Sequence, residues 1–121
     1  MKGLGIDIIE IERIKKAIKK RANFKKRFFT EIEIEYCEEY KIPWSHYAGR
    51  FAAKEAVVKA LGTGFREFKW QDIEIINDNL GKPEVNLYNQ AQKIAHKKGI
   101  EEIMLSISHS RDYAVAQAIA L

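Results

Sequence analysis

The fold is organised by residues 43–62, which read PWSHYAGRFAAKEAVVKALG. Proline is favoured in the first turn of a helix and glycine just past its end, so the sequence predicts one helix over residues 43–61. Apolar side chains and alanines occupy most sides of this helix, and a helix that is apolar nearly all round is buried. We therefore expect it to run through the centre of the protein, with the other elements packed around it.

Strands are predicted on both sides of this helix. Residues 2–9 open with two glycines and are rich in isoleucine, which is typical of a strand. Residues 70–76 and 83–87 flank a turn and predict a hairpin, and residues 102–108 and 113–121 predict a second one. The last strand has one face made of small side chains, which leaves room for a close neighbour such as another subunit: Ala114, Ala116, Ala118 and Ala120.

Shorter helices complete the pattern. Isoleucines spaced by three and four residues predict an amphipathic helix over residues 11–21, with a basic outer face. Asn23 is a candidate cap for a short basic turn of helix, and Thr30 and Glu33 match a capping box at the start of a helix over residues 31–40. A further helix is expected over residues 89–98. The chain is thus expected to be α+β, with antiparallel strands packed around a long buried helix in one domain over residues 1–121.

Charge is distributed in blocks along the chain, whose net charge is +4. All charged side chains of residues 13–29 are basic, and all those of residues 31–39 are acidic. A single-sign block favours an oppositely charged partner, although a solvated helix face is the ordinary alternative. No run of about 18 apolar residues occurs, so no membrane-spanning helix is expected. Cys37 is the only cysteine, which excludes an intrachain disulfide and favours a reducing cytoplasm.

Three charged residues stand in apolar surroundings. Asp7 lies inside an isoleucine-rich strand, where an unpaired buried carboxylate is costly. Glu55 and Lys59 share one face of the central helix, and an ion pair at this spacing is the ordinary explanation. However, the apolar flanks of Glu55 and Lys59 make their exposure doubtful. A hard cation bound by Asp7 and Glu55 would explain both carboxylates, because magnesium commonly takes one or two carboxylates together with waters and substrate phosphates.

A cluster of hydroxyls, an imidazole and a guanidinium ends the penultimate strand, at residues 106–111. A catalytic triad is disfavoured, because neighbouring residues on a strand point to opposite faces and no third member is evident. A phosphate-contacting His109 fits better, since Arg50, Lys59 and Arg111 are also available for phosphate oxygens.

Four segments resemble the motifs of the holo-acyl-carrier-protein synthases, within the 4′-phosphopantetheinyl transferase superfamily. They are GLGIDI at 3–8 with IERI at 11–14, GRFAAKEA at 49–56 with KA at 59–60, NLGKP at 79–83 and LSISHS at 105–110. The resemblance covers nearly the whole chain, in the family's order. It implies an enzyme that transfers the 4′-phosphopantetheine group of coenzyme A to a serine of apo-acyl carrier protein. The other product is adenosine 3′,5′-bisphosphate, and the reaction supports fatty-acid biosynthesis.

The same resemblance implies residue roles. Asp7 and Glu55 would bind the Mg²⁺ that grips the pyrophosphate of coenzyme A, and Glu55 and Lys59 would be catalytic. A wider set would line the coenzyme A site: Arg50, Lys59, Gly62, Gly64, Gly81, Lys82, Pro83 and His109. The acidic carrier protein would dock on the first helix and its neighbour, at Arg13, Lys16, Lys20 and Arg27. The resemblance also implies a homotrimer, with each active site between two subunits.

Two other functions agree with parts of the sequence. The basic block fits a nucleic-acid-binding module, but no known nucleic-acid motif is present and the two carboxylates would stay unexplained. We therefore expect neither nucleic acid nor a membrane as a partner. A magnesium-dependent phosphohydrolase would share the metal site and release its product without any carrier. The residues leave the general base open between Glu55 and a metal-bound water.

Overall fold

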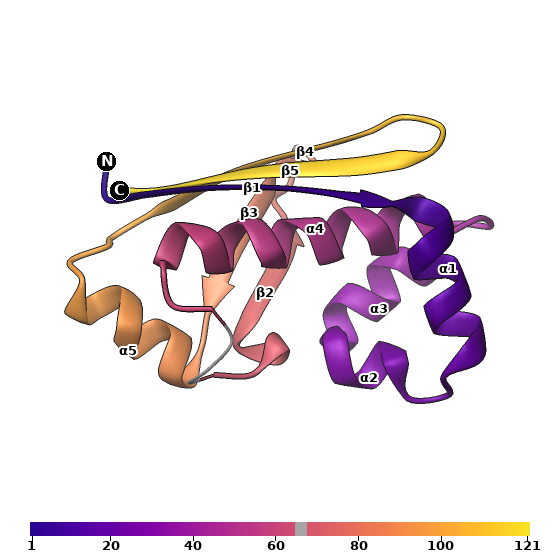
Figure 1. The fold of residues 1–121 in the computed structure, drawn as a ribbon, viewed down its shortest axis with the longest axis horizontal. Helices are drawn as coiled ribbons and strands as arrows, with labels where there is room; N and C mark the ends of the chain where they lie inside the picture. The colour runs from indigo at the N-terminus through magenta and orange to yellow at the C-terminus, as the bar shows by residue number, and fades with distance from the viewer. Residues whose placement is uncertain (65–67) are drawn as a thin grey trace.

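The computed structural model describes residues 1–64 and 68–121, and it centres on helix α4 (Trp44–Leu61), as Figure 1 shows. The helix follows Pro43 and ends at Leu61, just before Gly62, whose φ of 80° lies in the left-handed region that favours glycine. Most of its side chains are buried, which confirms the prediction of a long buried helix. In the part of the chain that the structure describes, no helix has the length and apolarity needed to cross a membrane.

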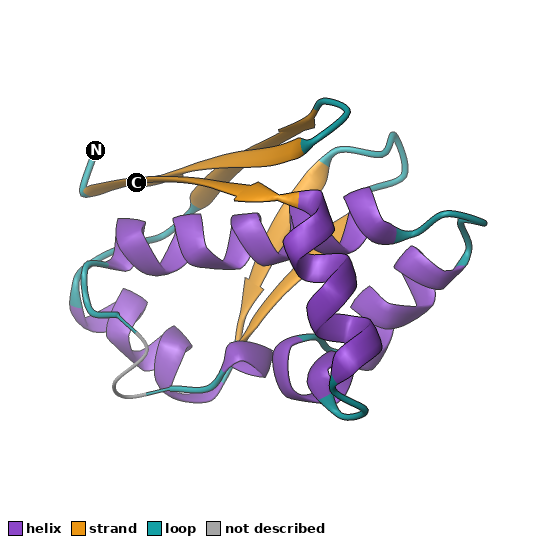
Figure 2. Cartoon of the chain, turned by 45° about the vertical axis from the view of Figure 1, so that its right-hand side comes forward, coloured by secondary structure: helices purple, strands orange, loops and turns teal. Residues whose placement is uncertain are grey.

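Two antiparallel sheets pack around α4. Strands β1 (Gly3–Glu10), β5 (Tyr113–Ala120) and β4 (Ile103–His109) form a three-stranded sheet in the order β1-β5-β4. Strands β2 (Ile73–Asn77) and β3 (Pro83–Leu87) form a separate hairpin. Figure 2 shows the larger sheet running along one side of α4, with the hairpin crossing behind the helix at a steep angle. This arrangement confirms the α+β class predicted from the sequence.

Shorter helices surround this centre. Helices α1 (Ile11–Lys20), α2 (Phe24–Phe28) and α3 (Glu31–Glu38) lie at the N-terminal end of α4, and α5 (Asn89–Lys97) lies at its C-terminal end (Figure 1). The capping box of α3 is confirmed: Thr30 Oγ1 accepts the Glu33 N–H, and a Glu33 carboxylate oxygen accepts the Thr30 N–H.

Three details of the elements differ from the sequence predictions. Helix α3 ends at Glu38, slightly before the predicted end. The side chain of Asn23 makes no capping hydrogen bond to α2. The segment predicted to open β2 forms a short 3₁₀ helix, η1 (Trp70–Asp72), instead of extended strand.

Glycines allow β1 to lie directly on α4. A Cβ atom built on Gly3 would lie 1.9 Å from the carbonyl oxygen of Ala60, and one on Gly5 would lie 1.9 Å from that of Ala56. No side chain fits at either position while the backbones stay where they are. The close contact brings Asp7, two residues beyond Gly5, against the same helix.

The alanine face of β5 also packs against α4. Residues paired directly across an antiparallel sheet share a face, and Asp7 is paired with Ala116, which in turn is paired with Ile107 of β4. All four alanines of this face are almost fully buried. The expected close neighbour is therefore α4 of the same chain, and the suggestion of another subunit at this face is corrected.

A fully buried ion pair joins α3 to α4. Lys54 Nζ lies 2.6 Å from a carboxylate oxygen of Glu33, and both side chains are 0% exposed. Lys54 also donates to the carbonyl oxygens of Phe28 and Trp70, at 2.9 and 3.1 Å. The other Glu33 oxygen accepts the N–H of Ile75 on β2 at 2.8 Å. This network, which was not predicted from the sequence, ties the two helices to the hairpin.

Candidate active site

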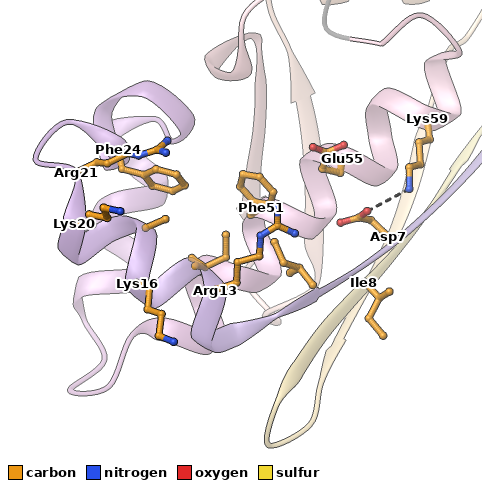
Figure 3. A pocket seen from close by; sticks show the side chains of 13 residues that line it. Asp7, Ile8, Arg13, Lys16, Lys20, Arg21, Phe24, Phe51, Glu55 and Lys59 are labelled. Carbon is orange, nitrogen blue, oxygen red and sulfur yellow. Dashed lines mark hydrogen bonds and ion pairs between the residues drawn. The ribbon is translucent and has the colours of Figure 1, made fainter.

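Asp7, Glu55 and Lys59 lie together, and we call them the acidic centre. Figure 3 shows Asp7 on β1 facing Glu55 and Lys59, which project from α4 one turn apart. Lys59 Nζ donates to Asp7 Oδ1 at 3.2 Å and to the carbonyl oxygen of Ile6 at 2.8 Å. Among the ion pairs of the described residues, Lys59 is thus paired with Asp7, rather than with Glu55 as the helical spacing suggests.

The side chains of the acidic centre differ in how exposed they are to solvent. The Lys59 side chain is 50% exposed, more than its apolar flanks indicated, whereas that of Asp7 is 18% exposed. Burial raises the pKa of Glu55, the nearby Asp7 carboxylate raises it further, and the Lys59 ammonium opposes both effects. Two partly buried carboxylates side by side favour the binding of a cation.

The donor set fits a hard, incompletely caged metal ion. Within the described ranges, no group of three or more His, Cys, Asp or Glu side chains is arranged to hold a metal. The acidic centre therefore supplies only the carboxylates of Asp7 and Glu55. Mg²⁺ is commonly bound in this way, because it keeps several waters and takes further oxygens from substrate phosphates.

A cavity of about 570 Å³ opens beside the acidic centre, between β1, α1, α2 and α4. Its apolar lining includes Ile9, Ile14, Phe24 and Phe51. Besides Lys59 of the acidic centre, its basic lining consists of Arg13, Lys16, Lys20 and Arg21 (Figure 3). Three of the four predicted docking residues therefore lie at the same cavity as the two carboxylates. The fourth, Arg27, is not part of the lining, and Arg21 is an additional basic residue that was not predicted from the sequence.

Helix α1 presents its basic residues on two faces. Arg13, Lys16 and Lys20 follow helical spacing on the face that lines the cavity. Lys15 and Lys19 lie on another face, with their ammonium groups 6.0 and 5.5 Å from the ring centroid of Trp44. Only part of the basic block therefore faces the acidic centre.

Arg50 and His109 belong to a second group, which we call the Arg50 cluster and which includes His46 and Asn77. Arg50 is 5% exposed, its Nη2 donates to Asn77 Oδ1 at 3.0 Å, and its Nε has no hydrogen-bond partner among the residues that the structure describes. The ring centroids of His46 and His109 are 6.1 Å apart. Burial, the neighbouring His109 and the Arg50 guanidinium all lower the pKa of His46.

The β2–β3 turn lies next to the Arg50 cluster. Asn77 is paired with Pro83 at the end of the hairpin, and Asp78 Oδ1 accepts the N–H of Lys82 at 2.9 Å. Gly81, with a φ of 85°, closes this turn. By contrast, Gly62 and Gly64 follow the end of α4 on the side of Lys59.

The acidic centre and the Arg50 cluster lie on different sides of α4. At about 100° and 1.5 Å per residue, the step from Arg50 to Lys59 turns two and a half times round the helix and advances about 13 Å. The two side chains therefore leave opposite faces. Within one chain, the predicted coenzyme A residues do not surround a single phosphate group.

Comparison with known proteins gives consistent matches over nearly the full chain. Residues 3–118 match the sequence model of the family described as the 4′-phosphopantetheinyl transferase superfamily. The holo-[acyl-carrier-protein] synthase of Caldanaerobacter subterraneus is 58% identical over 118 residues, which cover 98% of this chain and 93% of the relative.

Solved structures agree with the sequence matches. The holo-[acyl-carrier-protein] synthase of Neisseria meningitidis superimposes with a TM-score of 0.92 at 36% identity, covering 100% of this chain and 98% of that one. The corresponding Helicobacter pylori protein, in complex with coenzyme A, gives a TM-score of 0.86 at 33% identity, covering 98% and 99%.

Proposed function

The chain belongs to the 4′-phosphopantetheinyl transferase superfamily, and from this premise we propose that it transfers the 4′-phosphopantetheine group of coenzyme A to a serine of an apo-acyl carrier protein. The products are the holo-carrier protein and adenosine 3′,5′-bisphosphate. The observation that carries the proposal is the convergence of Asp7, Glu55 and Lys59 at a cavity with a basic rim. Such a cavity combines groups for phosphate chemistry with groups that attract an acidic protein.

Magnesium is part of the proposal, with Asp7 and Glu55 as its ligands. When bound, the ion supplies positive charge against the pyrophosphate oxygens of coenzyme A and so favours departure of the bisphosphate. The two partly buried carboxylates of the acidic centre support this assignment, because they offer the oxygen donors that Mg²⁺ prefers.

The chain's own side chains account for the rest of the reaction. The serine oxygen of the carrier attacks the β-phosphorus of coenzyme A, and the bond between that phosphorus and the oxygen of the leaving bisphosphate breaks. Lys59 is half exposed at the cavity and can neutralise charge on the phosphate oxygens. Glu55 lines the cavity and is the candidate in this chain to accept the serine proton. Positioning and charge neutralisation suffice for phosphoryl transfer, so a small site is adequate.

The carrier protein is the partner that fits the cavity rim. Arg13, Lys16 and Lys20 present positive charge beside the acidic centre, which complements an acidic protein. A nucleic-acid-binding role is a poorer fit, because it would leave the partly buried carboxylates of Asp7 and Glu55 without a function. Arg27 is exposed on α2 and is proposed as an outer docking contact.

A homotrimer with active sites between subunits is the assembly that we propose. The outer face of the three-stranded sheet carries large apolar side chains that are about half exposed, and contiguous apolar patches mark interfaces. These side chains are Leu4, Ile6, Ile8 and Met104. The placement of the acidic centre and the Arg50 cluster on opposite sides of α4 also supports shared sites. The acidic centre of one subunit would then face the Arg50 cluster of the next.

A cytoplasmic location belongs to the same proposal. Cys37 is a free thiol that is fully buried, and burial raises its pKa to about 12. A single unpaired thiol suits a reducing compartment.

Intact-mass spectrometry of an apo-acyl carrier protein tests the proposed reaction. The carrier would be incubated with this protein, coenzyme A and Mg²⁺, with EDTA and Glu55→Gln as controls. We expect a mass gain of one phosphopantetheine unit that both controls abolish or nearly abolish. Cleavage of coenzyme A without any change in carrier mass would favour a phosphohydrolase instead, and full activity of Glu55→Gln would refute the metal assignment.

A further inference from the structure

Lys59 forms an ion pair with Asp7, one of the two carboxylates that the proposed metal ion needs. Its ammonium lies 3.2 Å from Asp7 Oδ1 and donates to the carbonyl oxygen of Ile6 at 2.8 Å. Both contacts are to β1, so the end of this side chain is anchored across the gap between α4 and the sheet. In this position the ammonium is committed to the protein rather than to a substrate phosphate.

The contact between Lys59 and Asp7 has a clear electrostatic role. The Asp7 side chain is 18% exposed and Glu55 is partly buried, so the two carboxylates repel each other in a medium that screens them poorly. Within the described part of the chain, the ion pair with Lys59 is the one that neutralises Asp7. An uncompensated pair of carboxylates at this place would destabilise the contact between β1 and α4.

We propose that Lys59 and a divalent cation are alternative partners of Asp7. The ammonium holds the carboxylate in the metal-free protein, and entry of the cation releases Lys59 to bind a phosphate oxygen of coenzyme A. This inference rests on the proposed function, because it takes Asp7 and Glu55 as the metal ligands. An ammonium and a divalent cation on the same carboxylate oxygen repel each other, so their simultaneous contact is unfavourable.

The release requires no change in the fold. Lys59 is half exposed and has a flexible four-carbon stem, so its ammonium can turn from Asp7 into the cavity while α4 stays in place. The cation must therefore be present before Lys59 becomes fully available to coenzyme A. Lys59 is in this sense a residue whose position the metal ion controls.

Binding of Mn²⁺, measured by electron paramagnetic resonance without coenzyme A, tests the competition directly. We compare the unmodified protein with Lys59→Met, Lys16→Met and Asp7→Asn. Lys59→Met should bind Mn²⁺ about two- to fivefold more tightly, which is the range expected for releasing a partly exposed ion pair. Lys16→Met is the matched control, because it removes the same charge from the same cavity without touching Asp7. At about 0.15 M ionic strength its effect should be smaller, since separated charges are screened.

Chemical labelling of lysines gives a second readout that does not depend on affinity. An amine engaged in two hydrogen bonds reacts slowly with a methylating reagent, so Mg²⁺ should increase the labelling rate of Lys59, measured by peptide mass spectrometry. Lys16 serves as the internal reference. In Asp7→Asn the labelling of Lys59 should no longer respond to Mg²⁺.

The outcomes separate this inference from the metal assignment on which it rests. Equal Mn²⁺ affinity in Lys59→Met and the unmodified protein would overturn the competition, as would an equal gain in Lys16→Met. In both cases the loss of binding in Asp7→Asn would still support the metal site. If Asp7→Asn and the unmodified protein bind Mn²⁺ equally, the metal assignment fails, and the competition fails with it.

Discussion

Mixing two impaired variants should restore part of the activity if each site combines the acidic centre of one subunit with the Arg50 cluster of the next. The first variant, Glu55→Gln, keeps His109, and the second, His109→Ala, keeps Glu55. Glu55→Gln preserves the side-chain shape, and His109 is exposed, so we expect both variants to fold. The rings of His46 and His109 are 6.1 Å apart, and Lys59 lies about 20 Å beyond His46 along the axis of α4.

The expected gain follows from counting intact sites. In a random equal mixture, the subunit that supplies the acidic centre carries Glu55 in half of the cases. Its neighbour carries His109 in half of the cases. About one quarter of the sites are then intact, so the mixture should reach about 25% of the activity of the unmodified protein. Each variant alone should show only its residual rate.

Differently tagged variants, refolded together in equal amounts, provide the sample; the tags verify that mixed trimers form and are not used to select them. Transfer to apo-acyl carrier protein is followed by intact mass, and sedimentation gives the oligomeric state. A mixture no more active than the mean of the two variants alone would show that each site is complete within one subunit. That result would refute the argument from the two sides of α4.

Three further predictions concern the core, the sheet contact and the docking surface. Lys54→Met should lower the free energy of unfolding by about 3–5 kcal/mol in urea titrations, because it leaves the Glu33 carboxylate buried without its partner. The double variant Lys54→Met with Glu33→Gln should recover part of this loss. Gly5→Ala should lower the free energy of unfolding by about 1–3 kcal/mol or more and reduce turnover, because its methyl group would collide with a backbone carbonyl of α4; unchanged melting and turnover would contradict this contact. Lys16→Glu should raise the KM for the carrier by about fivefold with little change in kcat. Lys19→Glu, on the other face of α1, should change this KM less, and equal effects of the two variants would argue against docking at the cavity.

Most helices and strands could be predicted because their signals are local. The ends of α4, the capping box at Thr30 and the alternation in β5 each depend on residues within a few positions of one another. The segment before β2 was misassigned for an equally local reason. Asp72 accepts the N–H of Lys69 at 3.1 Å, and this side-chain contact favours a turn of 3₁₀ helix over extended strand.

The acidic centre was selected from the sequence because its members break an apolar pattern. Asp7 interrupts a strand of isoleucines, and Glu55 and Lys59 interrupt a buried helix, so each required a partner or a ligand. Lys54 breaks the same helix and was overlooked. Its partner Glu33 lies on another helix, and no local spacing connects the two.

The sequence was sufficient to predict the elements, the charged residues in apolar surroundings and the sign of the α1 surface, because these depend on periodicity and composition. Which side chains and elements contact one another was decided only by tertiary packing. Lys59 pairs with Asp7 of β1 although Glu55 is its helical neighbour, and β5 uses its alanines to approach α4. Arg50 and Lys59 share one helix yet face apart. Partner choice depends on which distant segments meet when the chain folds, and Gly3 and Gly5 permit the close contact of β1 and α4 that brings Asp7 to Lys59.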